Sequence, residues 1–402
     1  MSSAHGIKCC GKLILLIVVC SFSVYEQDAR LSEIRDLLVP MRIEQKELLP
    51  SRGATPQFTR VKHLLRDWVE SRLSGLAPTA QPNGLQAQLN AELKKAGLIC
   101  EYDANGTSEV PCPELGGAGF LGGIRLTEQN EILIVITGLS VQNCGFDESA
   151  YAYKWSDNAW QRFWKSEQDD YTADKYNPQE IVNVLISPRA AGGTNETSKR
   201  LVLTLGQNPW CTSSWQPIYY RVWRVGGQYS APKLLLQNSV IAFLTDPPFS
   251  GEVKPNEVQV EYPIHDVGTG IRTAIQHLSF EQDRVRRIEP YALSTNDFVD
   301  EWLQQPWSIS SVLSRFSEAR SWHEKLNADL KSGRYMDPRL PNPTAGCQTP
   351  GFWQESYRLS DSKKDMDEWE QIHFLVSWSP PYHFSLMGIS NKPWPGCNQE
   401  KR

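Results

Sequence analysis

The sequence predicts a mainly β protein of the α+β class, in which tandem four-stranded antiparallel units follow a helical N-terminal region and precede a helical insert. Two observations lead to this fold class. Displacing the chain by 67 residues (211 − 144 = 67) places Cys144 on Cys211 and residues 134–137 on residues 201–204, without a gap. Near residue 122 the spacing of apolar residues changes from a helical period to alternation. Self-similarity at a fixed period indicates that one supersecondary unit is used more than once.

Residues 1–23 have the features of an export signal. Lys8 and Lys12 precede an apolar stretch over 13–24, which is short for a membrane span. Small residues before position 24 predict cleavage after Ser23. Lipidation at Cys20 and retention as an uncleaved N-terminal anchor are the alternatives, and both would place membrane contact in this segment. We therefore expect an exported protein that is periplasmic, extracellular or anchored in a membrane by its N-terminus.

The cysteine content agrees with export. Six cysteines follow the predicted signal: Cys100, Cys112, Cys144, Cys211, Cys347 and Cys397. An even number in an exported chain predicts disulfides, although six cysteines allow about 15 pairings. We expect 100–112 across a short polar loop, 144–211 from the repeat, and 347–397 as the remaining pair. The alternative is a set of free buried thiols.

Charge and motifs argue against several classes of function. The net charge of −5, without a concentrated basic run, argues against a nucleic acid partner. No C-x-x-C or H-x-x-x-H spacing follows the signal, so we expect no metal and no other cofactor. Residues 117–122 match G-x-G-x-x-G, but they follow a loop and open a strand, which is not the context of a nucleotide site. Neither G-x-S-x-G nor H-E-x-x-H occurs.

The region 24–121 is predicted to be helical. Five apolar residues lie on one helical stripe: Val61, Leu64, Leu65, Trp68 and Val69. Gly75 ends that helix, and leucines at every fourth position over 85–93 predict a second helix that ends near Gly97. A further helix is expected around 31–38.

The region 122–295 is predicted to hold the repeated β units. In the first unit, residues 131–139 form a buried strand and residues 151–164 form a hairpin that turns at 156–159. The second unit supplies strands at 181–186, 200–205, 218–225 and 233–237. A third unit is indicated by spacing alone, because Val258 precedes His277 by 19 residues, as Leu201 precedes Tyr220.

Four antiparallel strands in tandem are typical of a β-propeller blade. Three units do not close a ring, so the last strands of the chain would have to supply a further blade. The competing architecture is a β-sandwich or a continuous sheet produced by duplication.

The segment 296–350 is predicted to be a helical insert followed by a loop. Phe298 and Trp302 form an apolar i, i+4 pair in its first helix, and a second helix is expected over 310–331. Residues 351–402 are expected to form C-terminal strands that pack on the β region. The three expected strands are 353–359, 371–378 and 382–389.

Two groups of residues are candidates for a functional site. His265, with Asp266 and Glu261 nearby in the sequence, could act as a general base oriented by a carboxylate, although no nucleophile is evident. Trp210 and Trp215 flank Cys211 in a loop-like stretch and could stack on a ligand, whereas most of the 14 tryptophans are expected in the core.

The sequence thus favours an exported, disulfide-bearing, β-rich binding or scaffold protein without catalysis, whose ligand is an unidentified protein or glycan. The alternative is a secreted hydrolase that acts on glycans, with paired carboxylates around an aromatic cleft.

Overall fold

The computed structural model describes most of the chain after the predicted signal. The described residues are 29–42, 55–76, 81–99, 119–142, 145–169, 179–189, 199–208, 214–226, 231–243, 249–267, 270–281, 284–338, 340 and 344–397. The segment 1–23 with Cys20, the cysteines at 100, 112, 144 and 211, and Trp210 lie outside these residues, so the expectations for them stay predictions. None of the described helices is both long and apolar enough to span a bilayer.

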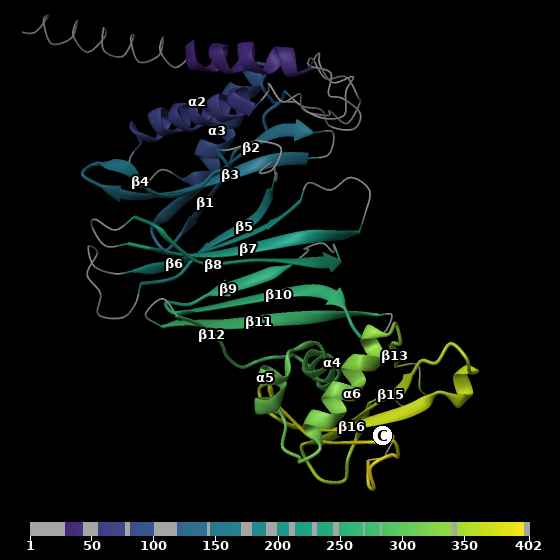
Figure 1. Ribbon diagram of the computed structural model, residues 1–402. Helices are drawn as coiled ribbons and strands as arrows, with labels where there is room; N and C mark the ends of the chain where they lie inside the picture. Colours follow the sequence, from purple (N-terminus) through teal and green to yellow (C-terminus); the bar gives the residue numbers. More distant parts are fainter. Residues whose placement is uncertain are drawn as a thin grey trace, which may run out of the picture.

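Four antiparallel sheets make up most of the molecule, which confirms the predicted fold class (Figure 1). The first sheet contains β1 (Arg125–Gln129), β2 (Ile132–Gln142), β3 (Gly145–Ser156) and β4 (Ala159–Ser166). The second contains β5 (Glu180–Ile186), β6 (Arg200–Gln207), β7 (Trp215–Val225) and β8 (Lys233–Phe243). The third contains β9 (Ser250–Val253), β10 (Glu257–His265), β11 (Ile271–Glu281) and β12 (Arg284–Arg287). In each of these sheets the strands pair in chain order, as a meander.

The fourth sheet is built from the end of the chain. Its strands are β13 (Met336–Asp337), β14 (Thr344–Gly346), β15 (Phe352–Leu359), β16 (Glu370–Ser379) and β17 (His383–Ser390). The helices are residues 29–42, α2 (Thr55–Leu73), α3 (Pro82–Lys95), α4 (Thr295–Gln304), α5 (Trp307–Ser310) and α6 (Ala319–Lys331). Two 3-10 turns, η1 (Ser311–Leu313) and η2 (Met366–Glu368), complete the described secondary structure.

The layers form an open stack. Buried clusters join the N-terminal helices to the first sheet, the first sheet to the second, and the second to the third. The fourth sheet shares its cluster with α4 and α6. Among the described residues no buried cluster joins the fourth sheet back to the first, so the sheets do not close a propeller ring (Figure 1).

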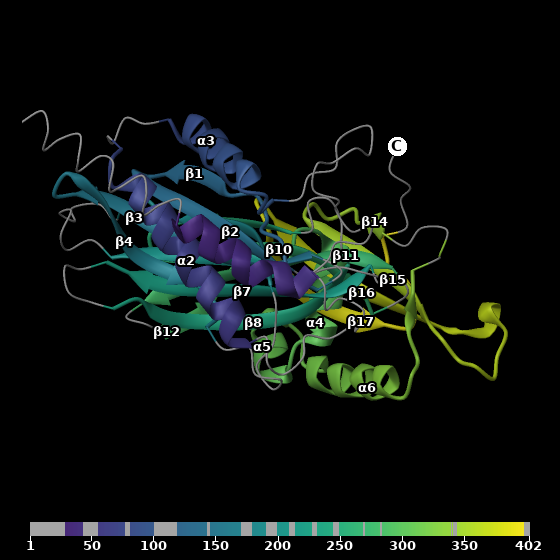
Figure 2. The same cartoon turned by 90° about the horizontal axis from the view of Figure 1, so that it is seen from above.

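The helical stripe read from the sequence is the buried face of α2. Val61, Leu65 and Trp68 are fully buried against the outer face of the first sheet. Seen from above, α2 lies across the strands of this sheet and α3 lies beside β1 (Figure 2). Burying the stripe in this way covers the apolar face that the first sheet turns away from the second.

Two-residue turns close the hairpins of the first sheet. Asn130 and Glu131 connect β1 to β2, and Asp157 and Asn158 connect β3 to β4, all with positive φ between 52° and 66°. Positive φ at both central residues is the type I′ geometry, which matches the twist of the flanking strands. The predicted turn at 156–159 is therefore present, with Ser156 paired to Ala159.

The 67-residue repeat holds for the second strand of each unit and fails for the third. Ile134 and Leu201 both face the following sheet. Tyr153, however, packs against the N-terminal helices, whereas Tyr220 faces the third sheet. The reason is register: β2 pairs Ile134 with Ala152, but β6 pairs Leu201 with Arg224. The second hairpin is thus offset by an odd number of residues, which turns each side chain of its third strand to the other face.

The insert differs from the prediction in one element. The helix expected over 310–331 is interrupted, since α5 ends at Ser310 and α6 begins at Ala319. Between them, the Arg315 N–H donates to the Leu386 carbonyl at 2.8 Å, and Ser314 forms a parallel bridge with Leu386. This backbone pairing with β17 replaces the helical hydrogen bonds of the segment.

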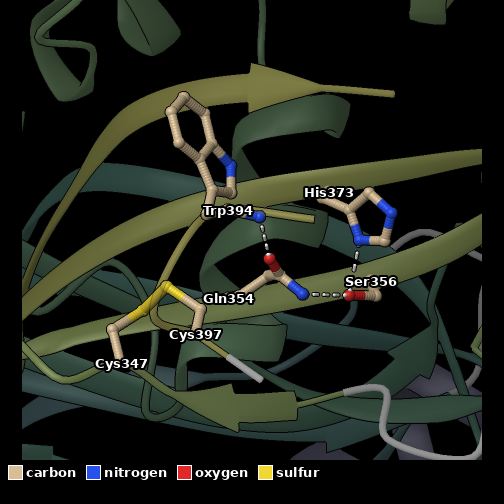
Figure 3. The surroundings of a disulfide bond; sticks show 6 residues. All are labelled: Cys347, Gln354, Ser356, His373, Trp394 and Cys397. Carbon is tan, nitrogen blue, oxygen red and sulfur yellow. Dashed lines mark hydrogen bonds between the residues drawn. A yellow bond between two sulfur atoms is a disulfide. The ribbon is translucent and has the colours of Figure 1, made fainter. Parts of the chain in front are cut away.

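A disulfide ties the C-terminal segment to the fourth sheet. Cys347 and Cys397 are bonded, with an S–S distance of 2.03 Å (Figure 3). Close by, the indole of Trp394 lies directly over Gly388 in β17, where an added Cβ would approach the ring to 2.6 Å. The sequence needs a glycine at that position for the segment to dock.

Candidate functional site

A cavity of about 500 Å³ lies between the first and second sheets. Its walls come from β3, the end of β4 and the residues that follow it, β5, β7 and β8. The lining residues are Asp147, Glu148, Lys165, Ser166, Glu167, Gln168, Gln179, Ile181, Arg221, Trp223, Leu234 and Gln237. This volume lies within the range of pockets that hold small ligands.

Strand alternation places the charged and aromatic walls. Tyr220 and Val222 of β7 face the third sheet, so Arg221 and Trp223 point the other way, toward the first sheet. On the facing sheet, Glu148 of β3 contributes its carboxylate to the same space. The site is therefore made where two sheets diverge.

Asp147 and Glu167 are carboxylates fully engaged by cations. Asp147 accepts a hydrogen bond from the Lys62 ammonium at 2.7 Å, with both side chains buried. Glu167 accepts from Arg66 and Lys165 at 2.8 Å each, and its side chain is 0% exposed. Burial by itself would raise the pKa of Glu167, but hydrogen bonds from Lys165 and Tyr151 and the charge of Arg66 outweigh it, and the pKa is lowered.

Glu148 has the opposite perturbation. Burial raises the pKa of its carboxyl group to about 7, despite the charge of Arg125 and a hydrogen bond from the Ile181 N–H at 2.6 Å. The negative charges of Glu180 and Asp147 act in the same direction as burial. Glu148 is thus poised to exchange a proton near neutral pH.

Arg221 is held by neutral groups. Its guanidinium donates to the side-chain oxygens of Gln179 at 2.7 Å and Gln237 at 3.2 Å. Among the described residues no carboxylate lies within ion-pair distance of it. Trp223 stands beside it and packs edge to face on Trp164 at 6.3 Å. A cation held by amides next to an indole wall can bind a polar or anionic ring.

A nearby group could in principle hold a metal. Ligand atoms of His63, Glu167 and Asp169 lie within 4.8 Å of one another. However, the Lys165 ammonium donates to Glu167 at 2.8 Å and to Asp169 at 3.1 Å. A cation of the protein already neutralises this cluster, and we assign no metal to it.

The residues that the sequence singled out lie elsewhere. Trp215 and His265 are brought together, with stacked rings whose centroids are 3.5 Å apart, and Phe243 packs on the same indole at 5.1 Å. Asp266 accepts a hydrogen bond from the Gly270 N–H at 3.0 Å, and Glu261 accepts one from Gln259 at 2.7 Å. Both carboxylates thus have partners of their own, and an aromatic cluster, not an acid–base pair, forms around His265.

A serine and a histidine also meet in the fourth sheet. Ser356 and His373 are cross-strand neighbours, and Ser356 Oγ lies 2.9 Å from His373 Nδ1 (Figure 3). Gln354 donates to the same oxygen at 3.1 Å, while the Trp394 N–H donates to the Gln354 side chain at 2.7 Å. Because Ser356 and His373 are each only 3% exposed, this pair is closed to a substrate.

Sequence reasoning did not find the cavity. Its residues come from five separate segments, and no motif connects them. The available signal was the alternation of Arg221 and Trp223 with buried residues along one strand, which by itself is also the pattern of a sheet face turned to solvent.

No protein-family model and no curated protein matches the chain. Among solved structures, the chain resembles one component of a BT0996 complex with RGII, with a TM-score of 0.25 and 6% identity over 66% of this chain and 72% of the other. A likeness of this size carries no argument about function. The class that the fold and cavity define is an open stack of β meanders with a polar pocket between two layers.

Proposed function

We propose that this is an exported binding or scaffold protein without catalysis, and that the cavity between its first two sheets binds a glycan. The carrying observation is the combination of Arg221, the two glutamine amides and the Trp223 ring around one space of about 500 Å³. Hydrogen-bonding planar groups recognise ring hydroxyls and carboxylates, and an aromatic face packs against the sugar ring.

Two features of the cavity support binding over hydrolysis. A glycosidase needs two carboxylates that can approach the scissile bond. Glu167 has no exposed surface and is engaged by Arg66 and Lys165. Glu148 is itself bonded to Arg125 at 2.7 Å.

One observation favours the second candidate, a glycan hydrolase. Glu148 has its pKa raised to about 7 by burial, as a general acid requires, while the pKa of Glu167 is lowered. We retain this candidate because its outcome differs in the same experiment.

Export is supported by the Cys347–Cys397 disulfide, because disulfides persist mainly in oxidising compartments. Peptide mapping of the mature protein without reductant tests it, since the proposal requires an N-terminus after residue 23, a lipid on Cys20 or a retained anchor.

The binding test compares neutral and uronate-containing oligosaccharides by titration calorimetry. We expect Arg221→Gln to weaken binding about tenfold or more, because a hydrogen bond to a charged group is worth about 1.5–3 kcal/mol. Arg224→Gln is the matched control, since Arg224 lies on the same strand but donates to the Phe280 carbonyl of the third sheet.

Two results would reject the proposal. One is the absence of binding to every oligosaccharide tested. The other is the release of new reducing ends by the wild type and their loss in Glu148→Gln, which would establish the hydrolase.

A further inference from the structure

The strand β8 is an edge strand of unusual composition. It lies at the end of the second sheet, and no strand in the described part of the chain pairs with its outer side. Its 11 residues include one charged side chain, Lys233 at the first position, and no proline. Leu234 is 40% exposed and Ile241 is 57% exposed. A long uncharged edge with exposed apolar residues is a template for pairing with another strand.

Other edge strands among the described residues are protected. β1 and β9 have 5 and 4 residues with acidic side chains, β4 carries an arginine and a lysine, and β12 contains three arginines. The outer edge of β5 is capped by side chains of the first sheet, since Glu148 accepts from the Ile181 N–H and Gln129 bonds Val184 and Ile186. β17 is bonded by the segment that follows η1. Short, charged or capped edges resist pairing, and β8 lacks these devices over residues 236–243.

One hydrogen bond identifies the backbone groups on the open edge. The Ser239 N–H donates to the side-chain oxygen of its neighbour Asn238 at 3.0 Å, so it does not point toward β7. Because N–H groups alternate along a strand, the N–H groups of Gln237 and Ile241 also point outward. The odd-numbered residues of β8 therefore offer their backbone groups to an added strand.

The side chains of β8 are palindromic about Asn238. Gln237, Asn238 and Ser239 are polar, and three apolar residues lie on each side: Leu234, Leu235 and Leu236 before them, and Val240, Ile241 and Ala242 after them. In an antiparallel pairing centred on Asn238, apolar residues meet apolar residues and Gln237 meets Ser239. This register also joins odd residues to odd residues, as the outward N–H groups require. The two copies of Lys233 lie at opposite ends, so they do not repel each other.

We propose that β8 pairs with β8 of a second copy of this chain, antiparallel and about a two-fold axis at Asn238, which joins the two second sheets into one. Such an interface is isologous, as in most homodimers. It is regular over residues 236–240, while β8 has a bulge near Leu235. Because a single strand pair buries little area, we expect a weak dimer whose population rises with concentration. This inference does not depend on a ligand in the cavity.

The first experiment is sedimentation velocity of the full chain over a concentration series. We expect the average mass of the wild type to rise from one chain toward two. Ser239→Pro removes an outward N–H and places its ring on the open edge, but the N–H groups that bond β7 belong to its neighbours. It should stay monomeric with an unchanged circular dichroism spectrum. Ser239→Ala, which retains the N–H, should associate like the wild type.

The second experiment tests the register and holds even if Ser239→Pro does not fold. Residues 238 of the two copies lie opposite each other on the axis, within reach of a disulfide. Asn238→Cys should therefore give a covalent dimer under oxidation, above the level of the wild type, and Ser239→Cys should give less. A wild type that stays monomeric, a folded Ser239→Pro that associates normally, or equal cross-linking at both positions would overturn the proposal, as would capture of a foreign strand by a monomeric wild type.

Discussion

At the scale of single residues, Glu355 shows how burial controls a carboxyl group in this protein. It lies in β15, 1% exposed, and accepts hydrogen bonds from the hydroxyls of Thr295 and, at 2.6 Å, Thr344. Burial raises the pKa of Glu355 to about 7, and the hydroxyl hydrogen bonds oppose this rise only in part. The group is therefore protonated in the folded protein at pH values where it is ionised in the unfolded chain.

The free energy of unfolding should depend on pH through Glu355. Between its unfolded pKa near 4.5 and its folded pKa of about 7, the folded state binds more protons. Stability therefore falls as pH rises through this window, by at most about 3 kcal/mol. Glu355→Gln keeps the shape and stays neutral, so urea unfolding should show a smaller loss between about pH 5 and about pH 8. The exposed Glu368→Gln should keep the wild-type dependence, and an unchanged dependence in Glu355→Gln would contradict the assignment.

Partners at this scale were beyond sequence reasoning. Lys62 and Asp147 are 85 positions apart, and Trp215 and His265 belong to different sheets. Apolar burial follows from local period, which is why the Val61 and Trp68 positions were predicted. Ion pairs and ring stacks depend on how distant elements cross, and the local pattern carries no record of that.

At the scale of elements, strands were predicted well and their registers were not. The expected strand 218–225 is the main part of β7, and 371–378 is that of β16. Alternation identifies a strand, whereas pairing depends on loop length, as the offset between the first two hairpins shows. The broken helix before Ala319 has a similar cause, since its competing partner in β17 is distant in the chain.

The disulfide should stabilise the fourth sheet as an element. Cys347 and Cys397 are separated by 50 residues, and closing a loop of that size is worth about 4 kcal/mol in the chain-entropy model. The double variant Cys347→Ala/Cys397→Ala should lower the unfolding midpoint of this region and expose the segment of Trp394 to hydrogen exchange. Reduction of the wild type is the control and should give a similar shift. Equal protection of residues 391–397 in both proteins would show that packing on Gly388 holds the segment alone.

At the scale of the whole molecule, the repeat predicted the units but not their assembly. Tandem meanders were expected from the sequence, and both a ring and a layered arrangement were compatible with them. The choice is made by the ends: the first sheet buries its outer face under α2 and α3, so that face is not available to a last blade. In an open stack each layer depends mainly on its neighbours.

The junction between the third sheet and the C-terminal part is polar. Arg272 of β11 lies between Asp300 and Glu301 of α4, and Arg287 of β12 also contacts Glu301. The large apolar clusters on the two sides are separate. Interfaces of this kind couple domains less tightly than a shared apolar core.

The two sides of this junction should therefore unfold in separate steps. Leu203 is fully buried in the cluster between the second and third sheets, and Leu326 is fully buried among α4, α6 and the fourth sheet. Each Leu→Ala substitution should cost about 2–5 kcal/mol. In calorimetry with hydrogen exchange, Leu203→Ala should lower the transition of the β stack and Leu326→Ala that of the C-terminal part, each leaving the other in place. If both variants shift one common transition equally, the buried ion pairs of Arg272 join the molecule into a single cooperative unit, and the stack is not modular.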